Sequence, residues 1–386
     1  MELLGKSKEE LRAFCESLGE PAYRGEQIYY ALYAERKFDL ARITNLPAAL
    51  RERLSKEACI TLPVVKQRFV SSDASVRYLF ALGVADENGE LNTESTEDTE
   101  KNKGEWANRS RRPAAVEAVF MPSEGRQTIC ISTQAGCAVD CHFCLTAQLG
   151  LIRNLTAGEI LAQVFLPLEE HKAQLTPQTN IVLMGQGEPL LNFEPVMAAV
   201  RILLDPQGVG ISAKHVTLST SGIVPGIELL AQEKVRPKLA ISLNASNDEQ
   251  RDVLMPINKK YPLSALMEVC KNYPLRTWEH LTFEYVMLGG VNDSAADARR
   301  VVRLLAPLKS VKVNLIPWNP GELPYRESSA EQIEEFRQIL VDRGVPTFVR
   351  YSRGRDVMAA CGQLALLNIS NASGETLQQQ PGSIGS

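Results

Sequence analysis

Short runs of β-branched and apolar residues alternate with amphipathic helical patterns between residues 128 and 349, which leaves few folds open to the chain. Six such runs lie at residues 128–132, 181–185, 215–219, 239–243, 281–287 and 311–316. Helical patterns follow most of them, at residues 156–166, 194–204, 226–233, 264–272, 293–305 and 331–343. Because strands that alternate with helices form parallel sheets, we predict an α/β fold. Six units are too few to close an eight-stranded barrel, so we expect an open, partial (βα)6 barrel with its chemistry at the carboxyl ends of the strands.

The segments that flank the predicted barrel differ from it in pattern. Residues 1–60 carry apolar side chains at helical spacing and predict an N-terminal helical domain. Residues 61–122 predict a strand-rich connector, interrupted by a polar stretch at 85–112 that cannot bury enough surface to fold and is expected to be a flexible loop. The barrel is expected to span 123–350, followed by a C-terminal segment at 351–370 and a flexible tail at 371–386.

Composition restricts the class of protein further. The 386 residues are 44% hydrophobic and 23% charged, which is ordinary for a soluble protein with a core. No apolar run approaches the ~20 residues of a membrane-spanning helix, and the first residues lack the apolar region of a secretory signal, so a cytoplasmic protein without membrane contact is expected. The net charge of −4 disfavours extensive coating by nucleic acid but allows a local basic face. Eight cysteines in a reducing compartment indicate metal or thiol chemistry rather than disulfides.

Three cysteines follow the first predicted barrel strand in the spacing C-x3-C-x2-C: Cys137, Cys141 and Cys144. Three thiolates on one short loop can converge on an iron–sulfur cluster. Three ligands leave one iron of a cubane free to chelate a small molecule. A zinc knuckle with His142 as fourth ligand is a second interpretation, although His142 directly follows Cys141, which makes joint ligation awkward. Three unrelated buried thiols are the third.

The cysteine spacing, with Phe143 before the last cysteine, resembles the signature of the radical S-adenosylmethionine (SAM) superfamily. The longer segment CISTQAGCAVDCHFCLTAQLGLIRNL resembles the RlmN/Cfr family, adenosine methyltransferases of ribosomal RNA. The resemblance extends from the N-terminal helices to about Leu367. It implies a radical SAM barrel, preceded by a helix-hairpin-helix-like RNA-binding domain, with one [4Fe–4S] cluster per chain and SAM as cofactors.

The implied reaction is methylation of carbon 2 of adenosine in 23S rRNA and in tRNA, at the adenosine 3′ of the anticodon. Two alternatives remain open at this point. One is a carbon-8 adenosine methyltransferase of the Cfr type. The other is a non-catalytic RNA-binding protein with a structural metal. The resemblance further implies a reductant protein such as flavodoxin, and we expect a monomer.

Polar residues at the ends of later strands are candidates for SAM binding. Gly187 and Glu188 belong to GQGEP after the second barrel strand, and the resemblance implies that this element meets the amino group of SAM. Glycines there let the backbone approach a ligand closely. Further candidates at strand ends, each of which could instead cap the following helix, are Ser219, Ser242, Leu243, Asn244 and Asn319. Many relatives have histidine where this chain has Asn244, and an amide cannot become cationic.

Two further cysteines and a glutamate complete the predicted site. Cys361 lies between basic residues and Gly362, a setting that suits a mobile loop and favours a thiolate, although a free cysteine is often a small core residue. Cys130 shares one strand face with Thr128, opposite the isoleucines on either side, and is expected to face the barrel interior. The resemblance implies that Cys361 carries the methyl group, that Cys130 resolves the covalent intermediate through a transient disulfide, and that Glu117 accepts a proton. Read locally, Glu117 could equally be a solvent-facing strand residue.

The remaining cysteines, Cys15, Cys59 and Cys270, lie in apolar patterns and are predicted to be core residues. Basic residues that could contact RNA phosphates are scattered along the chain, and each could equally be a solvated surface charge. They are Arg24, Lys103, Arg109, Arg111, Arg112, Lys259, Lys260, Arg350, Arg353 and Arg355.

Overall fold

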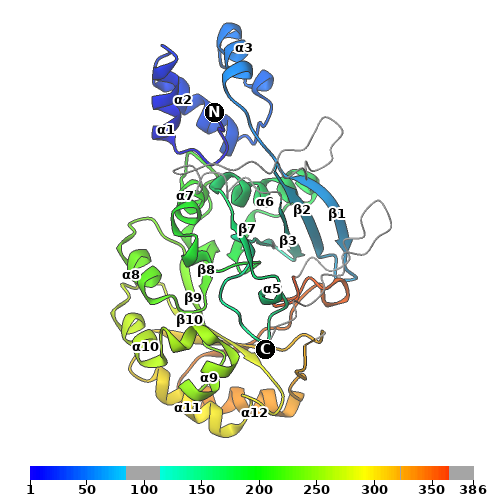
Figure 1. The fold of residues 1–386 in the computed structure, drawn as a ribbon, viewed down its shortest axis with the longest axis vertical. Coiled ribbons are helices and arrows are strands. Elements are labelled where there is room, and N and C mark those ends of the chain that lie inside the picture. Colours follow the sequence, from blue (N-terminus) through cyan, green and yellow to red (C-terminus); the bar gives the residue numbers. More distant parts are fainter. Residues whose placement is uncertain (84–113, 322, 365–386) are drawn as a thin grey trace, which may run out of the picture.

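The computed structural model describes residues 1–83, 114–321 and 323–364, which form a curved ten-stranded sheet with helices outside it (Figure 1). The strand order in the sheet is β1-β2-β3-β4-β7-β8-β9-β10-β11-β12. The strands are β1 (Val64–Val70), β2 (Val76–Leu82), β3 (Ala114–Ser123), β4 (Arg126–Cys130), β7 (Gln178–Leu183), β8 (Val216–Thr220), β9 (Lys238–Ser242), β10 (Leu281–Met287), β11 (Val311–Pro317) and β12 (Thr347–Val349). A separate hairpin pairs β5 (Gln134–Gly136) with β6 (Leu151–Asn154).

The six predicted parallel strands are present as β4 and β7–β11, in chain order and paired side by side. A seventh parallel strand, β12, extends the sheet and was missed, because three residues carry too little pattern to be read. Residues 61–122 do not form a connector separate from the barrel, because the strands they contain belong to the same sheet. These strands, β1–β3, pair antiparallel with one another, and β3 pairs with β4, where Val119 lies opposite Cys130. The predicted loop 85–112 and tail 371–386 lie outside the described residues.

Helices cover the outer face of the parallel strands (Figure 1). They are α6 (Ala157–Glu170), α7 (Phe193–Leu204), α8 (Val224–Gln232), α9 (Asp248–Leu254), α10 (Leu263–Asn272), α11 (Ala295–Leu305) and α12 (Ala330–Val341). Helix α6 begins with a capping box, in which the side chains of Thr156 and Glu159 each accept a hydrogen bond from the other's backbone amide. Outward strand residues such as Ile181, Leu218 and Ile241 are buried in the same core as the apolar faces of these helices. The inner face of the sheet is therefore left for the site.

The N-terminal helices α1 (Lys8–Ser17), α2 (Tyr23–Tyr33) and α3 (Ala48–Glu57) project from one end of the barrel (Figure 1). They are tied to it by polar contacts as well as by a continuous apolar core. The Tyr29 hydroxyl donates a hydrogen bond to Asp205 at 2.9 Å, and the Arg36 guanidinium pairs with Glu169 of α6. The helical domain predicted for residues 1–60 is therefore firmly seated on the barrel. Among the described residues, no helix combines the length and apolar character needed to cross a membrane.

Candidate active site

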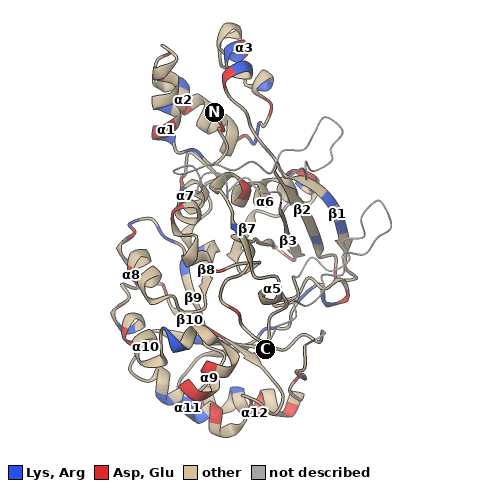
Figure 2. Cartoon of the chain, in the orientation of Figure 1, with Lys and Arg blue, Asp and Glu red and all other residues tan. Residues whose placement is uncertain are grey.

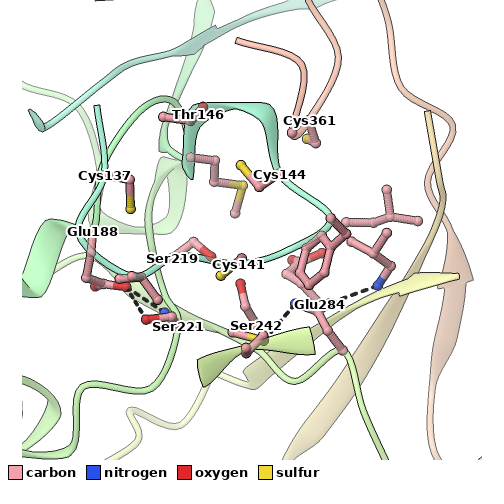
Figure 3. A pocket seen from close by; sticks show the side chains of 18 of the residues that line it. Cys137, Cys141, Cys144, Thr146, Glu188, Ser219, Ser221, Ser242, Glu284 and Cys361 are labelled. Carbon is pink, nitrogen blue, oxygen red and sulfur yellow. Dashed lines mark hydrogen bonds between the residues drawn. The ribbon is translucent and has the colours of Figure 1, made fainter. Parts of the chain in front are cut away.

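Two adjoining cavities occupy the inner face of the barrel. The first, here called the cysteine cavity, lies at the carboxyl ends of the strands and is lined by Cys137, Cys141 and Cys144 together with strand-end residues (Figure 3). The second, here called the basic cavity, lies deeper along the strands and is lined by Cys130 and by a set of lysines and arginines. The cavities share part of their walls, namely Cys144, Thr146, Met184, Gly185, Glu284, Ile316, Cys361 and Gly362.

The loop that carries the three cysteines is shaped by its backbone. Gly136 has φ +72°, and a Cβ at this position would lie 1.8 Å from the carbonyl oxygen of Gly150, so only glycine fits. The Cys137 amide then donates to that carbonyl at 2.9 Å, and the Cys144 amide donates to the Cys141 carbonyl at 3.0 Å. These contacts turn the three side chains toward one cavity. The motif lies in the connection between the two short strands of this hairpin, β5 and β6.

His142 is not placed as a fourth ligand. Its side chain is 46% exposed beside Asp140 and lies outside the lining of the cysteine cavity. The arrangement therefore does not provide the zinc knuckle considered from the sequence.

The residues present fit a soft, cysteine-ligated cluster together with a small polar ligand. Burial raises the pKa of Cys137 to about 12 and also raises the pKa values of Cys141 and Cys144, so three desolvated thiols share one wall. Such thiols are suited to a soft metal centre, which stabilises the thiolate form. The facing wall is polar at the ends of β8 and β9, where Ser219 and Ser242 lie (Figure 3). That wall can bind polar groups of a ligand held against the cluster.

The GQGEP element forms another part of this wall. Gly187 has φ +94°, and a Cβ there would lie 2.5 Å from the Gln134 side chain. The next residue, Glu188, is 3% exposed and its carboxylate accepts hydrogen bonds from the Ser221 amide and hydroxyl, both at 2.7 Å (Figure 3). Glu188 is therefore oriented before any ligand binds. Ser221 was not identified from the sequence, although it lies in the LSTSG run that drew attention to Ser219.

The other candidate SAM residues divide into two groups. Ser219, Ser242 and Asn319 line the cysteine cavity as expected. Leu243 is fully buried and lies outside the cavity lining. Its amide donates a hydrogen bond to the Glu284 carbonyl at 2.9 Å. Asn244 lines the cavity, but its side-chain oxygen accepts a hydrogen bond from the Val286 amide at 2.9 Å. That oxygen is engaged within the protein, so Asn244 offers a ligand less than the sequence suggested.

A buried arginine that the sequence analysis missed joins two of these strand ends. Arg251, on α9, is fully buried, and its guanidinium donates to the carbonyl oxygens of Ser221 at 2.6 Å and Ser242 at 3.1 Å. It also donates to the carbonyl of Leu243 at 3.1 Å. Nothing in the DEQRDVL run distinguishes Arg251 from a surface arginine, because the helix register that buries it depends on packing.

We expect the Arg251→Gln variant to lower the free energy of unfolding by about 3 kcal/mol, because several buried carbonyls lose a charged donor. Urea denaturation followed by tryptophan fluorescence measures this change. Arg299→Gln, at an exposed position of α11, is the matched control and should change stability by less than about 0.5 kcal/mol. Equal stability of the two variants would contradict the assigned role of Arg251.

Cys361 and Cys130 are brought together at the boundary of the two cavities. Cys361 lines both, whereas Cys130 lines the basic cavity alone. The predicted strand face of Cys130 is confirmed, since Ile129 and Ile131 are fully buried in the outer core while Cys130 packs near Ala359, two residues before Cys361. Cys361 is close enough to Cys130 to raise the pKa of that thiol, although burial has the larger effect.

The prediction that the surroundings of Cys361 favour its thiolate form is wrong. Cys361 is accessible to solvent but has protein on most sides, and this desolvation, with smaller effects of Glu284 and Cys144, raises its pKa to about 11. Arginines near it in sequence are directed elsewhere: Arg353 pairs with Asp73 and Arg355 with Glu327. Burial likewise raises the pKa of Cys130. Both groups are therefore thiols at neutral pH in the absence of a bound ligand.

The loop that carries Cys361 is anchored at its base and has left-handed turns within it. The Gly354 amide donates to Asp73 at 3.0 Å, and Asp356 accepts from the Ser72 amide at 2.9 Å, so the β1–β2 turn holds the start of the loop. Gly354 and Gly362 have φ +64° and +80°, conformations that glycine adopts readily. The end of the loop returns to the cysteine motif, where the Leu145 amide donates to the Gly362 carbonyl at 2.8 Å.

Glu117 lies on β3 and is 1% exposed, which rules out the solvent-facing interpretation. Its carboxylate forms an ion pair with Arg77, whose guanidinium stacks 4.0 Å from the centre of the Phe69 ring. Glu117 lines neither cavity, although it lies on the same sheet face as Val119, the residue opposite Cys130. The structure thus places this candidate near the site but oriented toward Arg77.

Glu284 is a third residue that the sequence analysis missed, after Ser221 and Arg251. It lines both cavities, accepts a hydrogen bond from Asn314 at 2.9 Å, and has its pKa raised by burial. A signal was available, because Glu284 is the single charged residue in the strand LTFEYVM. A lone carboxylate in a buried strand often indicates a polar interior.

Other predictions have mixed outcomes. Cys15 and Cys270 are buried as expected, but Cys59 is exposed at the junction between α3 and β1, so its assignment to the core was wrong. Among the candidate RNA contacts, Arg350 and Arg353 line the basic cavity, while Arg24, Lys259, Lys260 and Arg355 do not. Lys103, Arg109, Arg111 and Arg112 lie outside the described residues.

Comparison with known proteins agrees with this geometry. The model of the radical SAM superfamily matches residues 131–302, and that of the ribosomal RNA large subunit methyltransferase N-terminal domain matches residues 1–60. A probable dual-specificity RNA methyltransferase RlmN of Koribacter versatilis is 49% identical over 90% of this chain and 97% of its own length. The dual-specificity RNA methyltransferase RlmN of Anaeromyxobacter dehalogenans is 41% identical over 93% and 90%.

A solved structure shows the same architecture. The crystal structure of a radical SAM methyltransferase from Sphaerobacter thermophilus aligns with a TM-score of 0.81 and 39% identity, covering 94% of this chain and 99% of that one. Fold, cysteine cavity and relatives together define a radical SAM enzyme that uses a [4Fe–4S] cluster and SAM. The chain belongs to the RlmN family of RNA methyltransferases.

Proposed function

We propose that this enzyme methylates carbon 2 of adenosine in 23S rRNA and, in tRNA, of the adenosine 3′ of the anticodon. The observation that carries the proposal is the position of Cys361, whose side chain lines both the cysteine cavity and the basic cavity. One sulfur can therefore receive a methyl group on the SAM side and present it on the RNA side. Cys130, on the RNA side alone, is placed to react with that sulfur afterwards.

Each residue has a defined task in this proposal. Cys137, Cys141 and Cys144 would hold the cluster, which when bound supplies the electron for reductive cleavage of SAM. Gly187, Glu188, Ser219, Ser242 and Asn319 would hold SAM, with Glu188 oriented by Ser221 toward its amino group. Cys361 loses its proton and accepts a methyl group from one SAM molecule. After the methyl carbon has been joined to adenine, the Cys130 thiolate attacks the Cys361 sulfur, and the resulting disulfide releases methylated RNA.

Glu117 remains the proposed proton acceptor in the RNA adduct. Its position on the Cys130 face of the sheet supports this role, because Val119 on the same face lies opposite Cys130. Its carboxylate is held by an ion pair with Arg77. For direct transfer the side chain must turn away from Arg77.

The cellular location, the electron donor and the oligomeric state are also proposals. A cytoplasmic location suits an enzyme whose thiols must be reduced after every turnover. A one-electron reductant protein such as flavodoxin would supply the electrons. A single chain contributes all the residues assigned to the site, so a monomer is sufficient for activity.

The test is to incubate the anaerobically reconstituted protein with SAM, a reductant and a 23S rRNA fragment, and to locate the methyl group by mass spectrometry of nucleosides. We expect 2-methyladenosine. A methyl group on carbon 8 would instead support the Cfr-type alternative. Absence of any methylated adenosine would contradict the proposal.

Metal analysis separates the enzyme from the non-catalytic alternative. We expect about four irons and four sulfides per chain, as one cubane with three cysteine ligands requires. One zinc per chain, without sulfide, would indicate a structural metal. Analysis of the same preparation before and after reconstitution is the control for incomplete loading.

A further inference from the structure

The basic cavity contains far more positive than negative charge. It has a volume of about 610 Å³, and its lining includes six lysines and arginines, namely Arg126, Lys214, Lys238, Lys312, Arg350 and Arg353. Glu284 is the single carboxylate in the lining. Such a concentration is unexpected in a chain whose net charge is −4, and Figure 2 shows that acidic and basic residues are intermingled over the helices.

The strand register arranges these charges along the barrel axis. Arg126 and Lys238 are the first residues of β4 and β9, and Lys312 is the second residue of β11. The inward residues of β11 then change in character from Lys312 through Asn314 to Ile316, which already borders the cysteine cavity. On β4 the same progression ends at Cys130. The cavity is therefore cationic at the amino ends of the strands and carries the reactive thiols at the carboxyl ends.

The fold does not neutralise the central pair of lysines. Among the described residues, neither Lys238 nor Lys312 forms an ion pair, and both side chains are partly buried. Burial lowers the pKa of both, and a neighbouring cation lowers each further: Lys312 acts on Lys238, and Arg350 acts on Lys312. Glu279 raises the pKa of Lys238 and Glu284 raises that of Lys312, but these effects are smaller than that of burial. Unfavourable proximity of like charges in a cavity wall is relieved when an anion binds between them.

Two of the other cations of the lining already have partners, and the third, Arg126, is exposed at the start of β4. Arg353 is paired with Asp73, and the Lys214 ammonium lies 5.5 Å from the centre of the Trp278 ring. Arg350 donates to the Asn314 side chain at 3.2 Å, its guanidinium carbon lies 5.2 Å from the centre of the Phe348 ring, and among the described residues it has no carboxylate partner. Lys238, Lys312 and Arg350 are thus the group best suited to an incoming anion.

We propose that Lys238, Lys312 and Arg350 form a phosphate-binding site for the RNA strand, which holds the backbone beside the target adenosine while its base points up the cavity toward Cys130 and Cys361. This inference rests on the proposed function, which makes RNA the substrate. Enzymes that modify a base commonly turn the nucleotide out of its stack into a pocket. A nucleotide so turned presents its phosphate and its base to opposite ends of the pocket, which matches the progression from cations to thiols.

The experiment compares RNA binding by variants of the full chain loaded with its cluster. The test variant is Lys238→Gln with Lys312→Gln. The matched control is Lys271→Gln with Arg299→Gln, which removes the same charge from exposed positions of α10 and α11 that line neither cavity. Binding of a fluorescently labelled rRNA hairpin that contains the target adenosine is followed by anisotropy over a range of salt concentrations.

We expect the test variant to bind the hairpin about 10- to 100-fold more weakly, and the slope of log Kd against log salt concentration to fall by about two, because two phosphate contacts are lost. The control pair should stay within about twofold of the wild type. A charge-preserving variant, Lys238→Arg with Lys312→Arg, should retain most of the affinity. Iron content and thermal unfolding report whether each variant is folded.

Unchanged affinity and unchanged salt slope in the Gln variant would overturn the proposal. Equal losses in the Arg and Gln variants would also overturn it, because the positive charge would then not be the cause. If the proposed function were wrong but the phosphate site correct, the wild type would bind the hairpin through these lysines and leave its adenosine unmethylated.

Discussion

The Cys361→Ala variant is expected to form no methylated RNA, although it should still bind SAM and retain about four irons per chain. The reason is that, of the two thiols that line both cavities, Cys144 would be held by the cluster, which leaves Cys361 as the sulfur that can receive the methyl group on one side and present it on the other. Methylation is measured by transfer of label from isotopically labelled SAM to RNA under anaerobic conditions.

Cys59→Ala is the matched control for this experiment. Cys59 is an exposed cysteine at the edge of the N-terminal domain and lines neither cavity. It should leave methylation unchanged. Turnover by Cys361→Ala at the wild-type rate would show that methyl transfer does not pass through this residue. Loss of iron in Cys361→Ala would instead show that the change disturbs the cluster loop, which contacts Gly362 through the Leu145 amide.

The Cys130→Ala variant is expected to accumulate a covalent complex with RNA instead of product. Cys361 would still carry the methyl carbon to adenine, but no second thiol would be present to attack the Cys361 sulfur and break the link. Denaturing gel electrophoresis with labelled RNA detects the complex, and mass spectrometry of the digested protein places the attachment at Cys361.

A double variant provides the control for the trapped complex. Cys130→Ala combined with Cys361→Ala should form no covalent complex, because the attachment site is absent. Normal turnover by Cys130→Ala would contradict the assigned role of Cys130. A complex that persists in the double variant would place the link on another residue.

Much of the fold could be predicted from local sequence pattern, and the predictions failed where that pattern is short or where strand pairing is long-range. The six parallel strands were found because each is a short apolar run followed by a helix, but β12 has only three residues and was missed. Strands β1 and β2 lie in the segment that was expected to be rich in strands. They join the barrel sheet only because β2 pairs with β3, which is distant in sequence, and β3 pairs with β4. Pairing of this kind is set by long-range packing rather than by residue type.

The site shows the same division. Cys130 could be assigned to the inner face from the alternation of one strand. By contrast, the thiolate-favouring surroundings inferred for Cys361 from nearby arginines were wrong, because Arg353 and Arg355 bind carboxylates on other elements. Proximity in sequence did not predict proximity of charge in space.

By itself, the sequence determined the class of chemistry at this site. Cys137, Cys141 and Cys144 lie on one loop, where spacing alone brings ligands together, and Gly136 is required there by a backbone contact. Only the tertiary structure decided how the five cysteines proposed to be functional are divided between two cavities, with Cys361 on their shared wall. It also decided which cations face the interior, because the inward direction of Lys238 and Lys312 depends on the register of strands that are distant in the chain.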